Sequence, residues 1–318
     1  MNPAIPPDPE RTRVVDDNLV MHWLKRADLA LKTISYAQNH EDILLARALP
    51  DCDGFFIDVG ANHPVFHSVT KLFTDRGWSG INIEPSPPIF DRLQHDRPDQ
   101  INLNVGVGDV ATTLTFYETP TLHGWSTFRL ELAEHYRSIG VGVVERPVPV
   151  RTLSEVCAEH VGNRPIDFLK VDAEGFEKQV LFGMDFGRWR PRVLLIENVW
   201  PSEWEAHILA AGYLHAAFDG LNRFYVRAED QAILEAFRAP VNILDNFVPY
   251  EYVRLIDDYV RLIGNHVQSL GDHVRSIEEL NRKLAIKTSL IDALRADAPR
   301  VARKLRAVVG RLGGRRAG

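Results

Sequence analysis

The most informative segment of this 318-residue chain is Phe55-Phe56-Ile57-Asp58-Val59-Gly60-Ala61-Asn62. A short apolar run ends there in a turn of small residues, which is typical of a parallel strand that meets a ligand at its carboxyl end. The small side chains of the turn let a ligand approach the backbone closely. We therefore expect Asp58 and Gly60 to lie at a binding site.

Similar apolar runs, separated by helical patterns, recur between Tyr36 and Arg227. The runs are Phe55–Val59, Ile81–Glu84, Ile101–Val105, Asp167–Asp172 and Val193–Glu197. Strands that alternate with helices predict a parallel sheet. Asp219-Gly220 is a turn dipeptide between two later strands and indicates an antiparallel hairpin. The predicted fold class is therefore α/β: a Rossmann-like domain with a mostly parallel sheet and a C-terminal antiparallel hairpin.

The composition is that of a globular chain, with 45% hydrophobic and 25% charged residues, which excludes a wholly disordered or collagen-like protein. The net charge of −6 argues against nucleic acid as a partner. Cys52 and Cys157 form no CxxC or Cys/His cluster, so no disulfide framework or structural zinc site is indicated. Neither a secretory signal nor a run of about 18 apolar residues is present. We expect a cytoplasmic protein.

Acidic residues also follow the next two predicted strands. Glu84 ends the second strand, where a carboxylate can accept hydrogen bonds from both hydroxyls of a ribose. Asp109 follows the third strand, where an acid could bind an adenine amino group. A nucleoside ligand of this kind could belong to NAD or to S-adenosylmethionine. Positions 60–65 read Gly-Ala-Asn-His-Pro-Val and lack the G-x-G-x-x-G that cradles a pyrophosphate, which favours S-adenosylmethionine.

Four ordered blocks of the chain resemble the FkbM-type methyltransferases. The blocks are Ser35–Asp42 (SYAQNHED), Phe56–Pro64 (FIDVGANHP), Arg76–Pro85 (RGWSGINIEP) and Leu169–Glu177 (LKVDAEGFE). The resemblance implies a class I methyltransferase fold that uses S-adenosylmethionine and acts on hydroxyls of sugars or polyketides. It also implies contact with the cofactor by Gln38, Glu41, Asp58, Gly60, Asn62 and Glu84.

Methyl transfer to a hydroxyl is helped by a base that takes up the proton as the new bond forms. The candidates are Asp172 and Glu174, at the end of a predicted central strand, and His63, whose imidazole titrates near neutrality. Asp172 and Glu174 could instead contact the substrate, hold a divalent metal ion such as Mg²⁺, or only favour the N-terminus of a helix. A structural role in the turn is the alternative for His63.

Three more residues are candidates for contact with the substrate. Glu197 follows an apolar strand and should reach the same edge of the sheet. His123 and Trp125 lie in a long connection where the family resemblance places a substrate-side segment, and Trp125 could stack on a sugar ring. A solvated loop is the alternative for Glu197, and a core or lid aromatic is the alternative for Trp125.

The chain is expected to divide into four segments. They are a partly helical lead-in over residues 1–34, the methyltransferase-like domain over 35–248, a coiled-coil helix over 249–298 and a basic amphipathic tail over 299–318. Valine recurs at 253, 260, 267 and 274, with an aliphatic residue three positions after each, and Asn281 continues this column. The heptad pattern predicts a homo-oligomer through residues 253–291, with a single amphipathic helix folded back on the domain as the alternative.

The last twenty residues contain seven Arg or Lys and no acid, with apolar residues at helical spacing among them. A basic amphipathic segment binds anionic membrane surfaces. We expect peripheral contact with the inner face of the membrane through residues 299–318, with a solvated tail as the alternative.

Together these patterns predict an S-adenosylmethionine-dependent O-methyltransferase that acts on a hydroxyl of a sugar or glycan, such as a nucleotide sugar, glycolipid or polysaccharide. Two alternatives remain at this point. One is a non-catalytic assembly or scaffold protein with a degenerate methyltransferase domain, and the other is an NAD-dependent oxidoreductase.

Overall fold

The computed structural model describes residues 32–49, 53–197 and 203–313. The chain divides into two units, Met1–Tyr252 and Val253–Gly318. The first unit holds the sheets, and the second consists largely of one helix, α10 (Tyr250–Gly313). The predicted lead-in lies almost entirely outside the described residues.

The main sheet has seven strands in the order β10-β11-β9-β8-β2-β3-β4. Their bounds are β2 (Phe55–Val59), β3 (Ser79–Ile83), β4 (Ile101–Leu103), β8 (Phe168–Val171), β9 (Val193–Glu197), β10 (Tyr213–Phe218) and β11 (Asn222–Arg227). The strands from β4 to β9 are parallel, and β11 runs antiparallel to both β9 and β10. The predicted Rossmann-like sheet with a C-terminal antiparallel hairpin is therefore confirmed.

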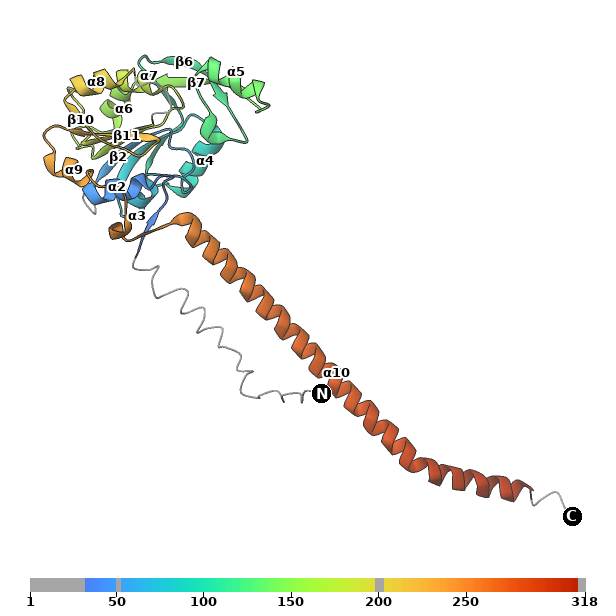
Figure 1. Ribbon diagram of the computed structural model, residues 1–318. Helices are drawn as coiled ribbons and strands as arrows, with labels where there is room; N and C mark the ends of the chain where they lie inside the picture. Colours follow the sequence, from blue (N-terminus) through green and yellow to red (C-terminus); the bar gives the residue numbers. More distant parts are fainter. Residues whose placement is uncertain (1–31, 50–52, 198–202, 314–318) are drawn as a thin grey trace, which may run out of the picture. The chain divides into compact units, whose positions relative to one another are not determined.

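Helices cover both faces of this sheet (Figure 1). One face carries α2 (Glu41–Ala48), α3 (Lys71–Asp75) and α9 (Gln231–Ala236), and the other carries α6 (Leu153–His160), α7 (Glu177–Phe182) and α8 (Glu205–Ala210). Successive strand residues point to opposite faces, so Phe56 packs with the first group and Ile57 with the second. Burial on both faces explains why the strands read as continuous apolar runs.

A second, three-stranded sheet was not predicted from the sequence. It has the order β5-β7-β6, with bounds β5 (Gly106–Val107), β6 (Thr112–Glu118) and β7 (Val144–Arg151). Pro147 and Pro149 lie within β7, and proline normally argues against a strand because it cannot donate to the ladder. The first half of β6 is also largely exposed, so it lacks a continuous apolar run.

The remaining elements of the first unit are short. They are β1 (Thr33–Ser35), α4 (Pro87–Asp96), the 3-10 turn η2 (His123–Trp125), α5 (Leu130–Ser138), the 3-10 turn η3 (Ile243–Asp245) and β12 (Phe247–Pro249). Strand β1 pairs in parallel with β12, which joins the two ends of this unit.

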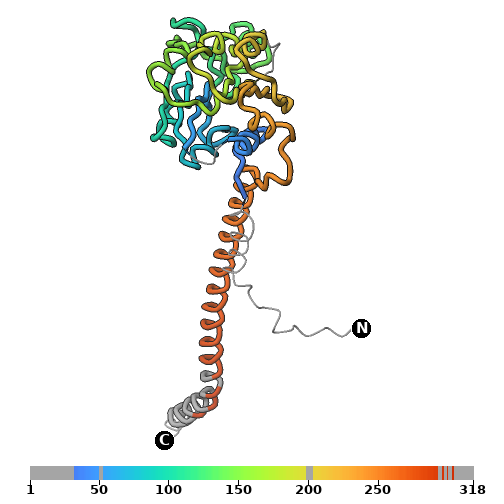
Figure 2. The backbone as a smooth tube through the Cα atoms, turned by 90° about the vertical axis from the view of Figure 1, so that its left-hand side faces the viewer, coloured from blue at the N-terminus to red at the C-terminus, as the bar shows by residue number. Residues whose placement is uncertain are grey.

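The long C-terminal helix expected from the heptads is present as α10, and Figure 2 shows its coloured part as a continuous helix. It includes Pro299 and so runs from the predicted coiled-coil segment into the predicted basic tail. Residues 314–318 of that tail lie outside the described residues. Within the described part of the chain, each helix is too short or too polar to cross a membrane.

Candidate functional site

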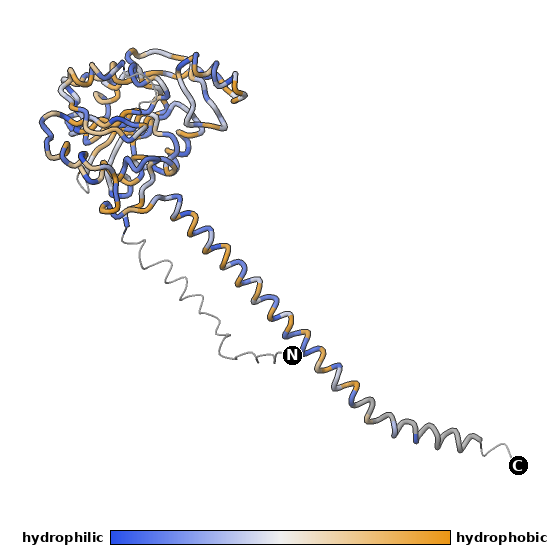
Figure 3. The backbone as a smooth tube through the Cα atoms, viewed as in Figure 1, coloured by the Kyte–Doolittle hydropathy of each residue, from blue (hydrophilic) through white to orange (hydrophobic). Residues whose placement is uncertain are grey.

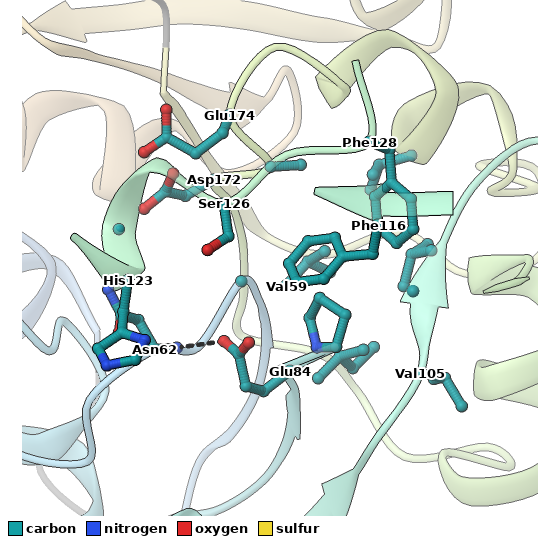
Figure 4. Close-up of a pocket in the computed structure, with 18 residues that line it drawn as sticks. Val59, Asn62, Glu84, Val105, Phe116, His123, Ser126, Phe128, Asp172 and Glu174 are labelled. Atoms are coloured by element: carbon teal, nitrogen blue, oxygen red, sulfur yellow. Dashed lines mark hydrogen bonds between the residues drawn. The ribbon is translucent and has the colours of Figure 1, made fainter. Parts of the chain in front are cut away.

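A pocket lies at the carboxyl ends of three neighbouring strands (Figure 4). Its lining includes Gly60 and Asn62 after β2, Glu84 after β3, and Asp172 and Glu174 after β8. Parallel strands bring their carboxyl ends to one edge of a sheet, where ligands bind in open α/β folds. Residues from three distant parts of the sequence therefore share one cavity.

The cavity has an acidic side and an apolar side. Asp172 and Glu174 lie next to each other on one side, while Phe116 and Phe128 lie on the other (Figure 4). Phe116 comes from β6, and Phe128 follows the turn η2. Sequence reasoning missed both aromatic residues, because the sheet that brings them over the strand ends was not predicted.

Glu84 is held by two backbone amides at the centre of the cavity. The N–H groups of Asn62 and Ser86 donate to its two carboxylate oxygens, each at 2.9 Å, and Figure 4 marks the first of these bonds. The side chain is 6% exposed, and this burial raises the pKa of Glu84 to about 7. Its oxygens keep lone pairs that can accept two hydroxyl groups.

The Gly60 turn is fixed by contact with the neighbouring strand. Gly60 has a φ of +72°, and a Cβ at this position would overlap the carbonyl oxygen of Asp172. The amide of Asp172 in turn donates to the carbonyl of Val59. Glycine is therefore required both by the left-handed backbone and by the close approach of β2 to β8.

Asp58 does not line the cavity but supports the residues that do. It is 1% exposed and accepts a hydrogen bond from the hydroxyl of Thr70 at 2.8 Å. The ammonium of Lys170 lies 3.1 Å from its Oδ1 and 3.3 Å from Asp172 Oδ2, and it donates to the carbonyl of Gly60. Burial lowers the pKa of Lys170, but the carboxylates of Asp58 and Asp172 outweigh that effect, so the net shift is upward.

This role for Lys170 was not predicted from the sequence. Its position inside an apolar strand was the available signal, because a buried lysine needs a paired charge. One ammonium thus ties together the ends of β2 and β8 and fixes the orientation of Asp172.

Three carboxylates gather at the acidic side. Asp172, Glu174 and Glu197 each offer an oxygen within 4.8 Å of the others. Burial and then the neighbouring Asp172 raise the pKa of Glu174 to about 8 and that of Glu197 to about 10. Glu197 also shares a hydrogen bond with Asp172, which requires a proton on one of the two carboxyls. Such a cluster can accept a proton or hold a divalent cation, for which the third ligand was not evident from the sequence.

A second cavity, of about 670 Å³, adjoins this cluster. Glu197 lines the second cavity, whereas Asp172 and Glu174 line the first, and Phe128 lines both. Most of the other residues around the second cavity are polar or charged, among them Arg129, Glu131, Glu177, Lys178 and Glu203, while Leu130 and Phe176 add apolar surface. The carboxylate cluster therefore lies where the two cavities meet.

His63 lies outside the lining of both cavities. Its Nδ1 accepts hydrogen bonds from the amides of Val65 and Phe66 at 3.0 and 3.1 Å. Burial, followed by the nearby Arg92, lowers its pKa. The imidazole thus stabilises the turn after β2, and its Nδ1 is occupied by backbone donors.

Three other candidates for cofactor contact do not line the cavity. Gln38 and Asp109 are exposed. Glu41 is buried, where it accepts hydrogen bonds from the side chain of Asn222 and the amide of Asn39. Glu41 therefore joins the start of the domain to β11.

Of the two substrate candidates in the connection that contains η2, one lines the first cavity and the other does not. His123 lines the first cavity together with Gly124 and Ser126. Trp125 does not line this cavity: it is 41% exposed, and its ring packs against that of Tyr136 with a centroid separation of 5.2 Å. The segment thus lies at the site, but through His123 and Ser126 and not through the tryptophan.

The sequence matches known methyltransferases. Residues 58–223 match the model of the methyltransferase FkbM domain. The chain is 31% identical over 180 residues to methyltransferase sdnD of Sordaria araneosa, covering 48% of this chain and 66% of that relative, just under two thirds of its length. It is 28% identical over 185 residues to methyltransferase 1 of Beauveria bassiana, covering 50% of this chain and 70% of the relative.

Solved structures give a weaker likeness. A TehB-like SAM-dependent methyltransferase from Corynebacterium glutamicum aligns with a TM-score of 0.33 and 10% identity, covering 59% of this chain and 87% of that one. A precorrin-6y C5,15-methyltransferase from Geobacter metallireducens aligns with a TM-score of 0.30 and 11% identity, covering 63% and 93%. Both scores are low, and the fold assignment above rests on the strand order.

Proposed function

Because the chain belongs to the FkbM methyltransferase family, we propose that it transfers a methyl group from S-adenosylmethionine to a hydroxyl of a sugar or glycan. The observation that supports this most directly is the carboxylate cluster at the junction of two cavities. One cavity suits the cofactor, the other suits a polar acceptor, and the acids lie between them. The oxidoreductase alternative is set aside because the family match is to methyltransferases.

The first cavity offers groups that fit each part of the cofactor. Phe116 and Phe128 provide aromatic surface for the adenine, and Glu84 provides acceptors for the ribose hydroxyls. On the acidic side, the carboxylate of Asp172 favours the positively charged sulfonium end. Asp109 is exposed and does not line this cavity.

When bound, the cofactor supplies a methyl group already activated by the positive sulfur. The acceptor oxygen would displace this methyl from sulfur, which would keep the electron pair of the broken carbon–sulfur bond, while Glu84 and Asp172 would hold the cofactor. Positioning contributes much of the rate in such an in-line transfer. The protein must also take up the proton of the acceptor hydroxyl.

We assign that proton to the carboxylate of Glu174. Asp172 is already held by the Lys170 ammonium at 3.3 Å and by its hydrogen bond with Glu197. Glu174, with a pKa raised to about 8, is a stronger base than an ordinary carboxylate and lines the cofactor cavity. Its backbone is also fixed, because Thr127 donates from its hydroxyl to the Glu174 carbonyl at 2.8 Å.

A sugar or glycan acceptor is supported by the charged lining of the second cavity. Arg129, Lys178 and Glu203 present donors and acceptors to it, as a hydroxyl-rich ligand requires. The test is a methyl-transfer screen of the full chain with labelled S-adenosylmethionine across nucleotide sugars, glycolipids and oligosaccharides. Transfer to a member of these classes supports the proposal, whereas a folded protein that fails to bind S-adenosylmethionine contradicts it.

A further inference from the structure

Helix α10 carries a long apolar seam that the single chain leaves exposed. From Val267 to Ile277 the seam residues are 37% to 65% exposed, and the same seam continues through Leu284 and Ile291, which are 63% and 49% exposed. Figure 3 shows apolar and polar segments alternating along this helix. Contiguous exposed apolar surface of this kind marks an interface.

The residues beside the seam show which partner fits. In heptad notation the valines occupy position a. Each e residue lies four positions after an a residue, and each g residue lies one position before an a residue. The e column contains Asp257, Gly264, Gly271, Glu278, Ala285 and Asp292, and the g column contains Tyr252, Tyr259, His266, His273, Leu280 and Lys287. Large or basic side chains thus occupy g, and small or acidic ones occupy e.

These columns are complementary when two copies run parallel and in register. A g residue then faces the e residue of the next heptad in the partner. Lys287 would face the partner's Asp292, and His273 would face the partner's Glu278. The apolar Leu280 would face the partner's Ala285.

The two glycines in the e column support the same arrangement. Glycine weakens a helix relative to alanine, yet a Cβ at Gly264 would meet nothing within 4 Å, and one at Gly271 would meet only Arg275 of the same helix at 3.8 Å. The single chain therefore gives no steric reason for either glycine. In a parallel pair the side chains of Tyr259 and His266 would need that space.

An antiparallel pair lacks this complementarity. In such a pair e faces e, and with the seams fully overlapped Asp257 would lie opposite the partner's Asp292. Gly271 would then face the partner's Glu278 instead of a ring. Asn281, at an a position, pairs with itself only in the parallel, in-register alignment, where a buried asparagine fixes register.

Val260 is already buried in the single chain, at 9% exposed, whereas the seam is exposed from Ile263 onward. We propose that residues 263–292 form a parallel, in-register coiled coil with a second copy of this chain. The contacts are the a and d seam together with the pairs from g to e described above. Since each catalytic domain joins its helix at Tyr252, a parallel coil holds the domains at the same end.

The first test is the orientation of the helices in the full chain. With Leu284→Cys at a d position, oxidation should give a disulfide-linked dimer whose peptides join residue 284 to residue 284. Glu279→Cys is the matched control, because position f points away from the seam and should cross-link far more slowly. Equal cross-linking of the two variants, or a mass equal to one 36.0 kDa chain in light scattering, would overturn the proposal.

The second test uses charge reversal. Lys287→Glu and Asp292→Lys should each weaken association several-fold, and the two together should restore it, because the reversed pair is again complementary in the parallel alignment. Gly264→Leu should raise helicity by circular dichroism but weaken association, whereas Ser276→Leu, at an outer position, should leave association unchanged. Loss of rescue in the double variant would contradict the parallel register.

Discussion

The Lys170 ammonium lies 3.1 Å from the Asp58 carboxylate, and both groups are buried beneath the Gly60 turn. Breaking a buried pair leaves one charge without compensation, which costs about 3 to 5 kcal/mol. We expect Lys170→Met to lower the free energy of unfolding by about that amount. Urea unfolding followed by tryptophan fluorescence measures it.

The control for this change is Lys178→Met, which removes a lysine from an exposed pair with Glu203. Exposed pairs contribute about 0 to 1 kcal/mol, so its stability should barely change. If both variants lost the same stability, the Lys170 pair would have no special structural role.

Substitution of Gly60 should disrupt the cofactor site. Gly60→Ala places a Cβ against the Asp172 carbonyl and forces a left-handed backbone on alanine. We expect strongly reduced S-adenosylmethionine binding by calorimetry together with a lower melting temperature. Gly77→Ala is the matched control, since Gly77 also has a positive φ of +82° but has open space around its Cβ position. Comparable losses in the two variants would show that strain alone, and not contact with β8, explains the glycine.

Cofactor affinity should depend on pH through Glu84. Its pKa is raised to about 7, so the acceptor carboxylate becomes more populated as pH rises from 6 to 8. The affinity for S-adenosylmethionine should therefore increase as pH rises through 7, by at most about 10-fold per pH unit, and level off above. Glu84→Gln should bind weakly and without this dependence, while Asp109→Asn should keep it. A pH-independent affinity of the unsubstituted protein for S-adenosylmethionine would contradict the assignment of Glu84 to the ribose hydroxyls.

Replacement of the assigned base should affect turnover more than binding. Glu174→Gln should lower kcat by about 10²- to 10⁴-fold while the Kd for S-adenosylmethionine changes little. The rate of the unsubstituted enzyme should rise as pH approaches 8, because Glu174 must be ionised to accept the proton. The exposed Glu235→Gln serves as control. Full turnover by Glu174→Gln would contradict the assignment of Glu174 as the base and would favour Asp172 instead.

Removal of divalent metal should leave turnover within about 2-fold of its starting value. Glu197, with a pKa of about 10, keeps its proton near neutral pH, and Lys170 offsets the charge of Asp172, so the cluster attracts a cation weakly. Activity measured with EDTA and then with added Mg²⁺ decides the matter. Loss with EDTA and recovery with Mg²⁺ would instead assign the three carboxylates as metal ligands.

Part of the fold could be predicted from the sequence because some strands are buried on both faces and are therefore continuously apolar. Phe55–Val59 and Val193–Glu197 were predicted with the bounds they have in the structure, since each is a continuous apolar run that begins and ends beside polar or small residues. Strand β7 was missed because Pro147 and Pro149 interrupt its pattern. The aromatic side of the cavity was missed with it, because Phe116 belongs to the partner strand β6.

By itself the sequence determined that Asp58, Glu84, Asp172 and Glu197 would reach one edge of a parallel sheet, since each closes or nearly closes an apolar run. Only the tertiary structure decided what each acid does there. Asp58 points down to Lys170, Glu84 is held by two amides, and Asp172 meets Glu197. The end of a strand sets the sheet edge that a residue reaches, and strand periodicity sets the face on which its side chain lies. The distances between charged groups, and the burial that raises the pKa of the carboxyl groups, arise only when separate strands pack together.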